Sequence, residues 1–347
     1  MSSCSLLSLT TAVPPHVIEQ HEAKVIGRRA FRRKNLFDKL APVFDNAAIA
    51  TRHIVAPHEW YETPHGWAER NAVYLAASEA MFEDAAGRAI ADSGLAPDQI
   101  DGVVTVSTTG IATPSLEARV GPRLGLRGNV RRVPVFGLGC AGGVSGLATT
   151  MRLAAAEPGS NWLFVTVETC SISIRLESDD PAAIIATALF GDGAAAAVVT
   201  AGAGGLATLT GAAEKLWPDT LGIMGWRVED PGLGVLFDRA IPPFIEANLA
   251  AAVDEMTTQL GIAREDIARF CCHPGGVKVI DAIETALALN QGELNLEREV
   301  LRDYGNMSAP TVLFVLDRLL ARGLPGKVMM TAFGPGFTCA GLLLEAA

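Results

Sequence analysis

Short apolar runs rich in β-branched residues alternate along the chain with longer stretches in which apolar residues recur every three or four positions. The first pattern is typical of buried strands, and the second is typical of helices with one buried face. Strands are predicted at residues 5–13, 101–107, 131–137, 162–167, 194–200, 267–272 and 328–332, and helices at 24–34, 69–93, 115–124, 141–156, 181–189, 244–260, 277–289 and 308–322. Because strands and helices alternate, the pattern predicts a three-layer α/β architecture.

The two halves of the chain share a local arrangement, in which an apolar strand ends at a reactive residue and continues into a helix. Cys140 holds that place in the first half and His273 in the second. The similarity indicates an internal duplication. The glycine-rich, weakly charged stretch 201–213 is the candidate boundary, and it divides the chain into residues 1–210 and 211–347.

The composition is that of a globular protein with a large core. Of the 347 residues, 49% are hydrophobic and 19% are charged, which excludes global disorder. The formal net charge of −10 argues against nucleic acid as a partner. The six cysteines form no Cys-x-x-Cys pair, so the sequence predicts neither a metal site nor a disulfide framework. The N-terminus lacks a secretory pattern and the uncharged stretches are broken by glycine, so we expect a cytoplasmic protein without a membrane span.

Cys140 stands in a glycine-rich turn, Phe-Gly-Leu-Gly-Cys-Ala-Gly-Gly, between a predicted strand and a predicted helix. A cysteine at a helix N-terminus is expected to have a lowered pKa, and the free amides there can stabilise an oxyanion. Two alternatives remain open from this segment alone. The thiol could be a small buried hydrophobe, or Gly137, Gly139 and Gly142 could form a dinucleotide-binding turn.

His273 and Asn306 are the other candidate catalytic residues. The remaining five histidines all precede residue 66, and His273 follows an apolar strand, where ligands gather in α/β sheets. A structural role is the alternative for this histidine. Asn306 precedes an apolar helix, so its amide either caps that helix or polarises a carbonyl group beside the histidine.

Five segments together resemble the type III polyketide synthases, the chalcone synthase-like family of the thiolase fold. These segments are residues 139–143 (GCAGG), 189–193 (LFGDG), 273–276 (HPGG), 304–308 (YGNMS) and 333–336 (FGPG). The resemblance covers nearly the whole chain. It implies a duplicated αβαβα arrangement with mixed β-sheets.

The resemblance assigns a role to each candidate. Cys140 would carry the starter and the growing chain as a thioester, and His273 would hold Cys140 as a thiolate. His273 and Asn306 would bind the malonyl thioester oxygen while decarboxylation develops enolate charge on it. Acyl-CoA and malonyl-CoA would be the substrates, with no further cofactor, and the enzyme would be a homodimer.

The resemblance also implies the surroundings of these three residues. Phe190 falls on the position that separates the CoA tunnel from the cavity, and Thr113 lies in a segment that reaches the neighbouring subunit. The other expected cavity positions are Thr108, Thr109, Cys170, Ser171, Ser173, Trp226, Gly275, Gly276 and Ser308. The expected contacts to CoA are Lys39, Arg52, Arg28 and Arg32.

Two further segments, 66–71 (GWAERN) and 224–226 (MGW), resemble the bacterial branch that makes alkylpyrones and alkylresorcinols. That resemblance implies a fatty acyl-CoA starter and a long apolar tunnel lined by small residues. Three alternatives are kept. They are an initiating β-ketoacyl synthase that uses acyl carrier protein, a nucleotide-dependent oxidoreductase, and a dimeric scaffold without activity.

Overall fold

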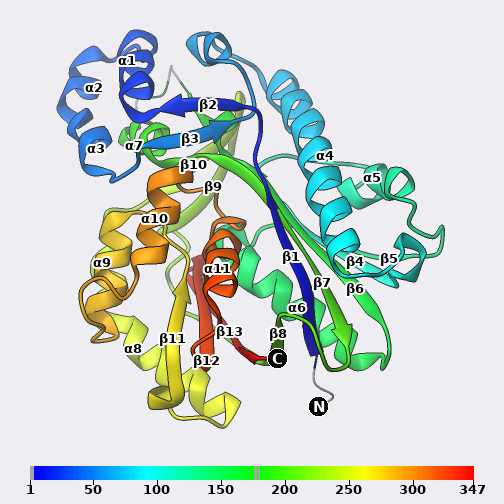
Figure 1. Ribbon diagram of the computed structural model, residues 1–347. Coiled ribbons are helices and arrows are strands. Elements are labelled where there is room, and N and C mark those ends of the chain that lie inside the picture. Colours follow the sequence, from blue (N-terminus) through cyan, green and yellow to red (C-terminus); the bar gives the residue numbers. More distant parts are fainter. Residues whose placement is uncertain (1–3, 176–177, 179) are drawn as a thin grey trace.

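A nine-stranded mixed sheet runs through the computed structural model, which describes residues 4–175, 178 and 180–347 (Figure 1). Its strands lie in the order β11-β12-β13-β8-β1-β7-β6-β4-β5. The strands are β1 (Cys4–Ala12), β2 (His16–Glu19), β3 (Thr51–Ile54), β4 (Gly102–Val106), β5 (Arg131–Val135), β6 (Asn161–Thr169), β7 (Asp192–Ala201), β8 (Ala207–Leu216), β9 (Met224–Glu229), β10 (Gly232–Phe237), β11 (Ile267–Cys272), β12 (Lys327–Gly334) and β13 (Thr338–Ala346).

Helices cover both faces of this sheet and form a small lobe beside it (Figure 1). The helices are α1 (Gln20–Ala30), α2 (Lys34–Leu40), α3 (Pro42–Asn46), α4 (Trp67–Asp92), α5 (Leu116–Leu124), α6 (Gly142–Ala156), α7 (Pro181–Leu189), α8 (Ile241–Leu260), α9 (Val277–Ala286), α10 (Asn295–Tyr304) and α11 (Thr311–Arg322). Within the described ranges, none of these helices is long and apolar enough to cross a membrane.

The sheet consists of two halves with the same strand pattern. In the first half β4 is parallel to β6, and β6, β7 and β1 follow in antiparallel pairs. In the second half β11 is parallel to β12, and β12, β13 and β8 follow in antiparallel pairs. The halves join where β1 pairs with β8. The predicted boundary between residues 210 and 211 falls inside β8.

This topology corrects the predicted correspondence between Cys140 and His273. His273 directly follows β11, whose counterpart in the first half is β4, so its equivalent position is the turn that begins at Ser107. Cys140 instead follows β5, which lies outside β4 at the edge of the sheet. The duplication is therefore visible in the strand order, while the two reactive residues come from different positions in it.

Two buried helices form the centre of the molecule. α6 contacts β4, β6 and β7 of the first half as well as β8, β12 and β13 of the second half, and it also contacts α11. α4 covers the outer side of β1, β6 and β7, while α8 and α9 lie together against the second half. The layers therefore run helix, half-sheet, helix, half-sheet, helix, as the αβαβα prediction requires.

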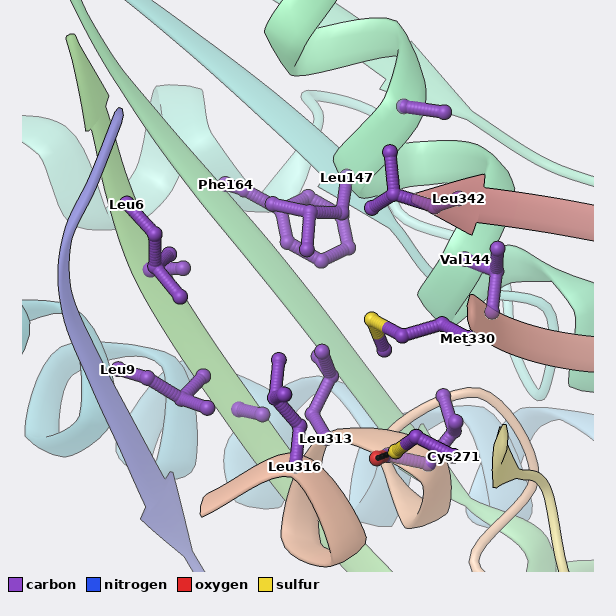
Figure 2. Close-up of a cluster of buried hydrophobic side chains, with 14 of the residues drawn as sticks. Leu6, Leu9, Val144, Leu147, Phe164, Cys271, Leu313, Leu316, Met330 and Leu342 are labelled. Atoms are coloured by element: carbon purple, nitrogen blue, oxygen red, sulfur yellow. Dashed lines mark hydrogen bonds between the residues drawn. The ribbon is translucent and has the colours of Figure 1, made fainter. Parts of the chain in front are cut away.

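The central layer is held by apolar packing from both halves. Figure 2 shows Leu147 of α6 beside Phe164 of β6 and Leu342 of β13, while Leu313 of α11 lies next to Leu316 in the same buried cluster. All five side chains are fully buried. Burying a side chain of this size contributes about 1.5–3 kcal/mol to stability. Packing in this layer therefore fixes the positions of the N-termini of α6 and α11.

The predicted single helix at 24–34 is wrong. α1 ends at Ala30, and α2 begins at Lys34 after a bend. The rings of Phe31 and Phe37 stack at 5.7 Å, and both are buried. A continuous helix would place these two aromatic residues on different faces, so the chain bends to bury both.

Candidate active site

Cys140 lies in a tight 3-10 turn between β5 and α6. Gly139 precedes it at φ +50°, and a Cβ there would lie 2.7 Å from Pro335 Cδ. A Cβ on Gly334 would lie 2.6 Å from the Cβ of Ala141. The turn that carries Cys140 is therefore packed against the turn between β12 and β13. Glycine at positions 139 and 334 permits this contact, because any larger residue there would clash.

The first turn of α6 also touches the loop that carries Asn306. A Cβ on Gly143 would lie 2.2 Å from the carbonyl oxygen of Ala309, closer than any Cβ can approach. Gly142 is equally close to β4, because its Cβ would lie 2.6 Å from Val106 Cγ1. These glycines let the helix of the nucleophile and the Asn306 loop approach each other.

The side chains of Cys140, His273 and Asn306 line one buried cavity. Three different elements supply them: the turn before α6, the end of β11 and the loop before α11. The side chains are 8%, 3% and 0% exposed, and the centre of a water molecule can reach only about 20 Å³ of the cavity. The structure thus brings together the three residues that the sequence singled out.

The amide of Asn306 is fixed by its neighbours. Its Nδ2 donates to the carbonyl oxygen of Gly275 at 3.0 Å, and its Oδ1 accepts from the backbone N–H of Ser308 at 2.8 Å. These bonds orient the NH₂ group toward the cavity side of the loop. An amide NH₂ has two hydrogens, so one remains available to a bound carbonyl group.

Burial controls the protonation of Cys140 and His273. It raises the pKa of Cys140 to about 11, helped by the charge of Glu168 and opposed by a hydrogen bond from Sγ to Ser308 Oγ at 3.4 Å. It lowers the pKa of His273 to about 3. The direction for Cys140 is opposite to the predicted lowering of its pKa, because burial removes water from the thiol.

Neither ring nitrogen of His273 has a hydrogen-bond partner among the described residues. A buried polar atom without a partner is costly, and such atoms concentrate where a ligand completes the site. The neutral imidazole therefore faces the cavity with both nitrogens free to bind a substrate or the Cys140 thiol.

A buried carboxylate, Glu168, lies at the end of β6 close enough to influence Cys140. It accepts hydrogen bonds from the N–H of Thr108 at 3.0 Å and from Thr109 Oγ1 at 2.8 Å. Burial raises its pKa to about 7. The sequence did not single out Glu168, because nothing in the local pattern indicates that two threonines from the turn after β4 bind it.

The raised pKa of Glu168 predicts a pH dependence of stability. Between about pH 4.5 and 7 the unfolded chain releases this proton and the folded chain keeps it, so stability falls as pH rises through that window and is then level. The contribution amounts to about 3 kcal/mol. We expect Glu168→Gln to remove that part of the decline, measured as the free energy of urea unfolding at pH 5 and pH 7.5.

Glu246→Gln, which changes an exposed carboxylate on α8, is the control and should keep the wild-type decline. Parallel pH profiles for wild type and Glu168→Gln would contradict the assignment.

Comparison with known proteins identifies the family of the chain. The model of the N-terminal domain of chalcone and stilbene synthases matches residues 2–203, and the model of the C-terminal domain matches residues 208–347. The chain belongs to the chalcone and stilbene synthase family. It is a type III polyketide synthase with a thiolase-like fold, and hence an acyltransferase.

Several relatives resemble the synthase over nearly its full length. A 1,3,6,8-tetrahydroxynaphthalene synthase of Streptomyces peucetius subsp. caesius is 34% identical over 98% of this chain and 93% of its own. A putative chalcone synthase of Bacillus subtilis is 32% identical over 98% of both chains. The crystal structure of the 1,3,6,8-tetrahydroxynaphthalene synthase of Streptomyces coelicolor, a bacterial type III polyketide synthase, superposes with a TM-score of 0.93 at 30% identity and covers 99% of each chain.

The family excludes the oxidoreductase and the initiating β-ketoacyl synthase as alternatives. The geometry adds a reason against the first. In the synthase, Gly139 and Gly142 of the glycine turn lie against Pro335 and Val106, so protein atoms occupy the space that a dinucleotide would need beside them.

Seven of the predicted cavity residues of the synthase line pockets near Cys140. Cys170, Phe190, Trp226 and Ser308 share one pocket with the nucleophile. Thr109 and Ser173 line a neighbouring pocket, which also has Trp226 in its wall. Gly275 lies in the wall of the catalytic cavity itself.

Four other predicted positions lie elsewhere in the synthase. Thr108 is buried and holds Glu168, and Ser171 binds Asp192 instead of facing the cavity. Gly276 is the buried N-cap of α9. Thr113 is exposed, and its bond to Pro114 is cis.

The predicted CoA contacts divide into two groups. Arg28, Arg32 and Lys39 are exposed on the lobe formed by α1 and α2, where Arg28 also pairs with Asp38. Arg52 is only 2% exposed and donates to backbone carbonyl groups. A phosphate cannot reach its guanidinium, so the prediction that Arg52 contacts CoA is wrong.

The sequence reasoning missed one wall of the cavity. The hairpin β9–β10 contributes Met224, Val235, Leu236 and Phe237 beside Trp226. The ring of Phe237 lies 6.0 Å from that of Phe190. The apolar run 232–237 was the available signal, since a run of this kind ahead of a helix is typical of a buried strand.

Proposed function

We propose that the synthase carries acyl groups on Cys140 and extends them with malonyl-CoA by decarboxylative Claisen condensation. The observation that supports this most directly is the single buried cavity shared by Cys140, His273 and Asn306. It combines a nucleophile, a base and a fixed amide donor, which are the groups that such chemistry requires.

In the loading step, His273 accepts the thiol proton as Cys140 attacks the carbonyl carbon of the acyl-CoA, and the CoA sulfur leaves with that proton. Separated charges are unfavourable in the buried cavity, since burial raises the pKa of Cys140 and lowers that of His273. Proton removal therefore accompanies attack, as expected of a nucleophile activated by an adjacent base.

In the extension step, malonyl-CoA loses CO₂ and its thioester oxygen takes up enolate charge. Asn306 Nδ2 and a ring N–H of His273 donate to that oxygen. The enolate carbon then attacks the Cys140 thioester, and the sulfur of Cys140 leaves as thiolate. Transfer of the lengthened chain back to Cys140 permits the next cycle.

For the starter we propose a fatty acyl group, with an alkylpyrone or alkylresorcinol as the product. Support comes from Trp226, which separates the Cys140 pocket from a second pocket that extends to Trp67 at the start of α4. Ile172 and Leu233 give this second pocket an apolar wall. A shift of the Trp226 ring would join the two pockets and admit an alkyl chain.

The cavity differs from the expected tunnel lined by small residues. Phe190, Trp226 and Phe237 form an aromatic wall, and a water centre reaches only about 30 Å³ of the pocket beside Cys140. This narrowness favours a second candidate, a compact product built without a long starter, which would suit the tetrahydroxynaphthalene synthases among the relatives.

The Trp226→Ala variant separates the two candidates. We expect wild type to accept acyl-CoA starters, from octanoyl-CoA through stearoyl-CoA, and to extend them with malonyl-CoA. Trp226→Ala should shift the preferred starter to longer chains, as measured by mass spectrometry of the products. Trp217→Ala is the control, because Trp217 packs on Phe244 and Phe337. Product from malonyl-CoA alone, with no use of long starters by either protein, would overturn the fatty acyl proposal.

We further propose a homodimer that forms through the edge of β5. This strand ends the sheet, and Phe136 and Ile111 beside it are 60% and 50% exposed. The groove between them offers about 340 Å³ to the centre of a water molecule, and Glu117 Oε2 in its wall has no partner among the described residues. An unpaired edge strand with exposed apolar neighbours suits pairing with a second copy.

Light scattering should give about twice the chain mass of 36.4 kDa, and a monomer would overturn this proposal.

A further inference from the structure

Arg52 on β3 lies under the point where the Phe190 and Asn306 segments meet. Its side chain is among the largest that are fully buried. Nη1 donates to the carbonyl oxygen of Thr187 at 2.5 Å and to that of Phe190 at 2.9 Å. A single guanidinium nitrogen thus fixes the last turn of α7 to the residue at the cavity wall.

The segment held by Arg52 is joined directly to Asn306. The N–H of Asn306 donates to the carbonyl oxygen of Leu189 at 2.8 Å, and the N–H of Gly191 donates to that of Asn306 at 3.0 Å. This short parallel bridge sets the distance between Phe190 and Asn306. A displacement of Phe190 would therefore move Asn306 as well.

The stem of Arg52 supports the other side of the same bridge. A Cβ on Gly305 would lie 2.8 Å from Arg52 Cγ and Cδ, and Gly305 adopts φ +67°. Figure 1 shows β3 next to α7, and β3 also contacts α10, whose end leads into Gly305. Arg52 consequently contacts both strands of the bridge, one through its donor and one through its methylene groups.

The charge of Arg52 is held at a cost in free energy. Burial lowers its pKa to about 10, while the nearby carboxylate of Asp192 favours the charged form. Its Nε has no hydrogen-bond partner among the described residues. A buried guanidinium that is only partly satisfied adds little stability, so its contact with the catalytic bridge is the more direct reason for its presence.

We propose that Arg52 is a positioning residue that aligns the Asn306 amide and the Phe190 ring with Cys140. The inference rests on the roles proposed above for Asn306 and Phe190. Arg52 touches no substrate. It acts on malonyl decarboxylation only through the bridge.

Arg52→Met keeps the packing under Gly305 and removes the donors. We expect the kcat for malonyl-CoA decarboxylation to fall by between about 10-fold and 10²-fold, because a displacement of about 1 Å costs that much. The KM for malonyl-CoA should stay within about threefold, since CoA lies outside this contact. Arg52→Lys keeps the charge but can donate to only part of the two-carbonyl contact, so its kcat should lie between those of Arg52→Met and wild type. If Arg52→Met does not fold, Arg52→Lys is the variant that tests the proposal.

A double-mutant cycle supplies a readout that a general loss of stability would not move. If Arg52 acts through Asn306, adding Arg52→Met to Asn306→Ala should lower kcat by less than twofold further, because the group it positions is already gone. Arg127→Met is the control. Arg127 donates to the backbone of Ile100 and to Asp101, remote from the cavity, so its loss should leave kcat unchanged.

The outcomes are distinct. An unchanged kcat in Arg52→Met, or multiplicative losses in the double variant, would overturn the inference and leave the proposed role of Asn306 intact. A wild-type rate in Asn306→Ala alone would overturn both.

Discussion

Replacing Cys140 by alanine should abolish polyketide formation while leaving measurable decarboxylation of malonyl-CoA. The thioester sulfur is lost, so neither starter nor intermediate can be held for attack. His273 and Asn306 remain in the same cavity and can still stabilise the enolate oxygen. The two activities are measured separately, as product by mass spectrometry and as release of CO₂ from labelled malonyl-CoA.

Cys4→Ala is the matched control, because Cys4 is also a buried thiol and its Sγ donates to the carbonyl oxygen of Met151, remote from the cavity. We expect this variant to form product at the wild-type rate. Product at that rate from Cys140→Ala would refute the covalent mechanism, and an inactive wild type that forms no acyl adduct on Cys140 would favour the scaffold alternative.

Asn306→Ala should slow decarboxylation of malonyl-CoA by about 10²–10³-fold, the usual loss when one oxyanion donor is removed. The effect should appear mainly in kcat, because Nδ2 meets its strongest acceptor only when charge develops on the oxygen. Single-turnover release of CO₂ measures this step without interference from later condensation.

Asn306 also accepts a hydrogen bond from the N–H of Ser308, so the alanine variant could lose loop geometry as well as a donor. Asn306→Asp keeps that acceptor and removes the donor, and it should be at least as slow. Asn248→Ala removes an amide whose Nδ2 bonds only within α8, to Phe244, and should be neutral. A decarboxylation rate within twofold of wild type in both Asn306 variants would remove this residue from the mechanism.

The sequence singled out the three residues that line the buried cavity because each lies in a local pattern. Cys140 follows a strand and opens a helix, and His273 ends a strand. Periodicity and glycine placement report such positions directly. The same local reasoning placed α6 and β11 within a residue or two of their observed bounds.

What the sequence could not show depends on contacts between distant segments. Nothing in the sequence around Arg52 distinguishes it from other arginines, and only the fold reveals that it is buried and donates to the carbonyl group of Phe190. The pKa of Cys140 likewise depends on how completely other segments exclude water from the thiol. The counterpart of His273 could be identified only once the strand order was known.

The central place of β1 has a consequence for how the chain is made. β1 pairs with β7 and β8, whose residues are synthesised about two hundred positions later. Contacts across such separations form slowly, and an unpaired strand edge is prone to aggregate in the interval. A fragment that stops before β8 would expose one side of β1 permanently. Expression of the two halves as separate polypeptides should therefore yield insoluble material, whereas a circular permutant that preserves β7-β1-β8 pairing has a route to the native fold.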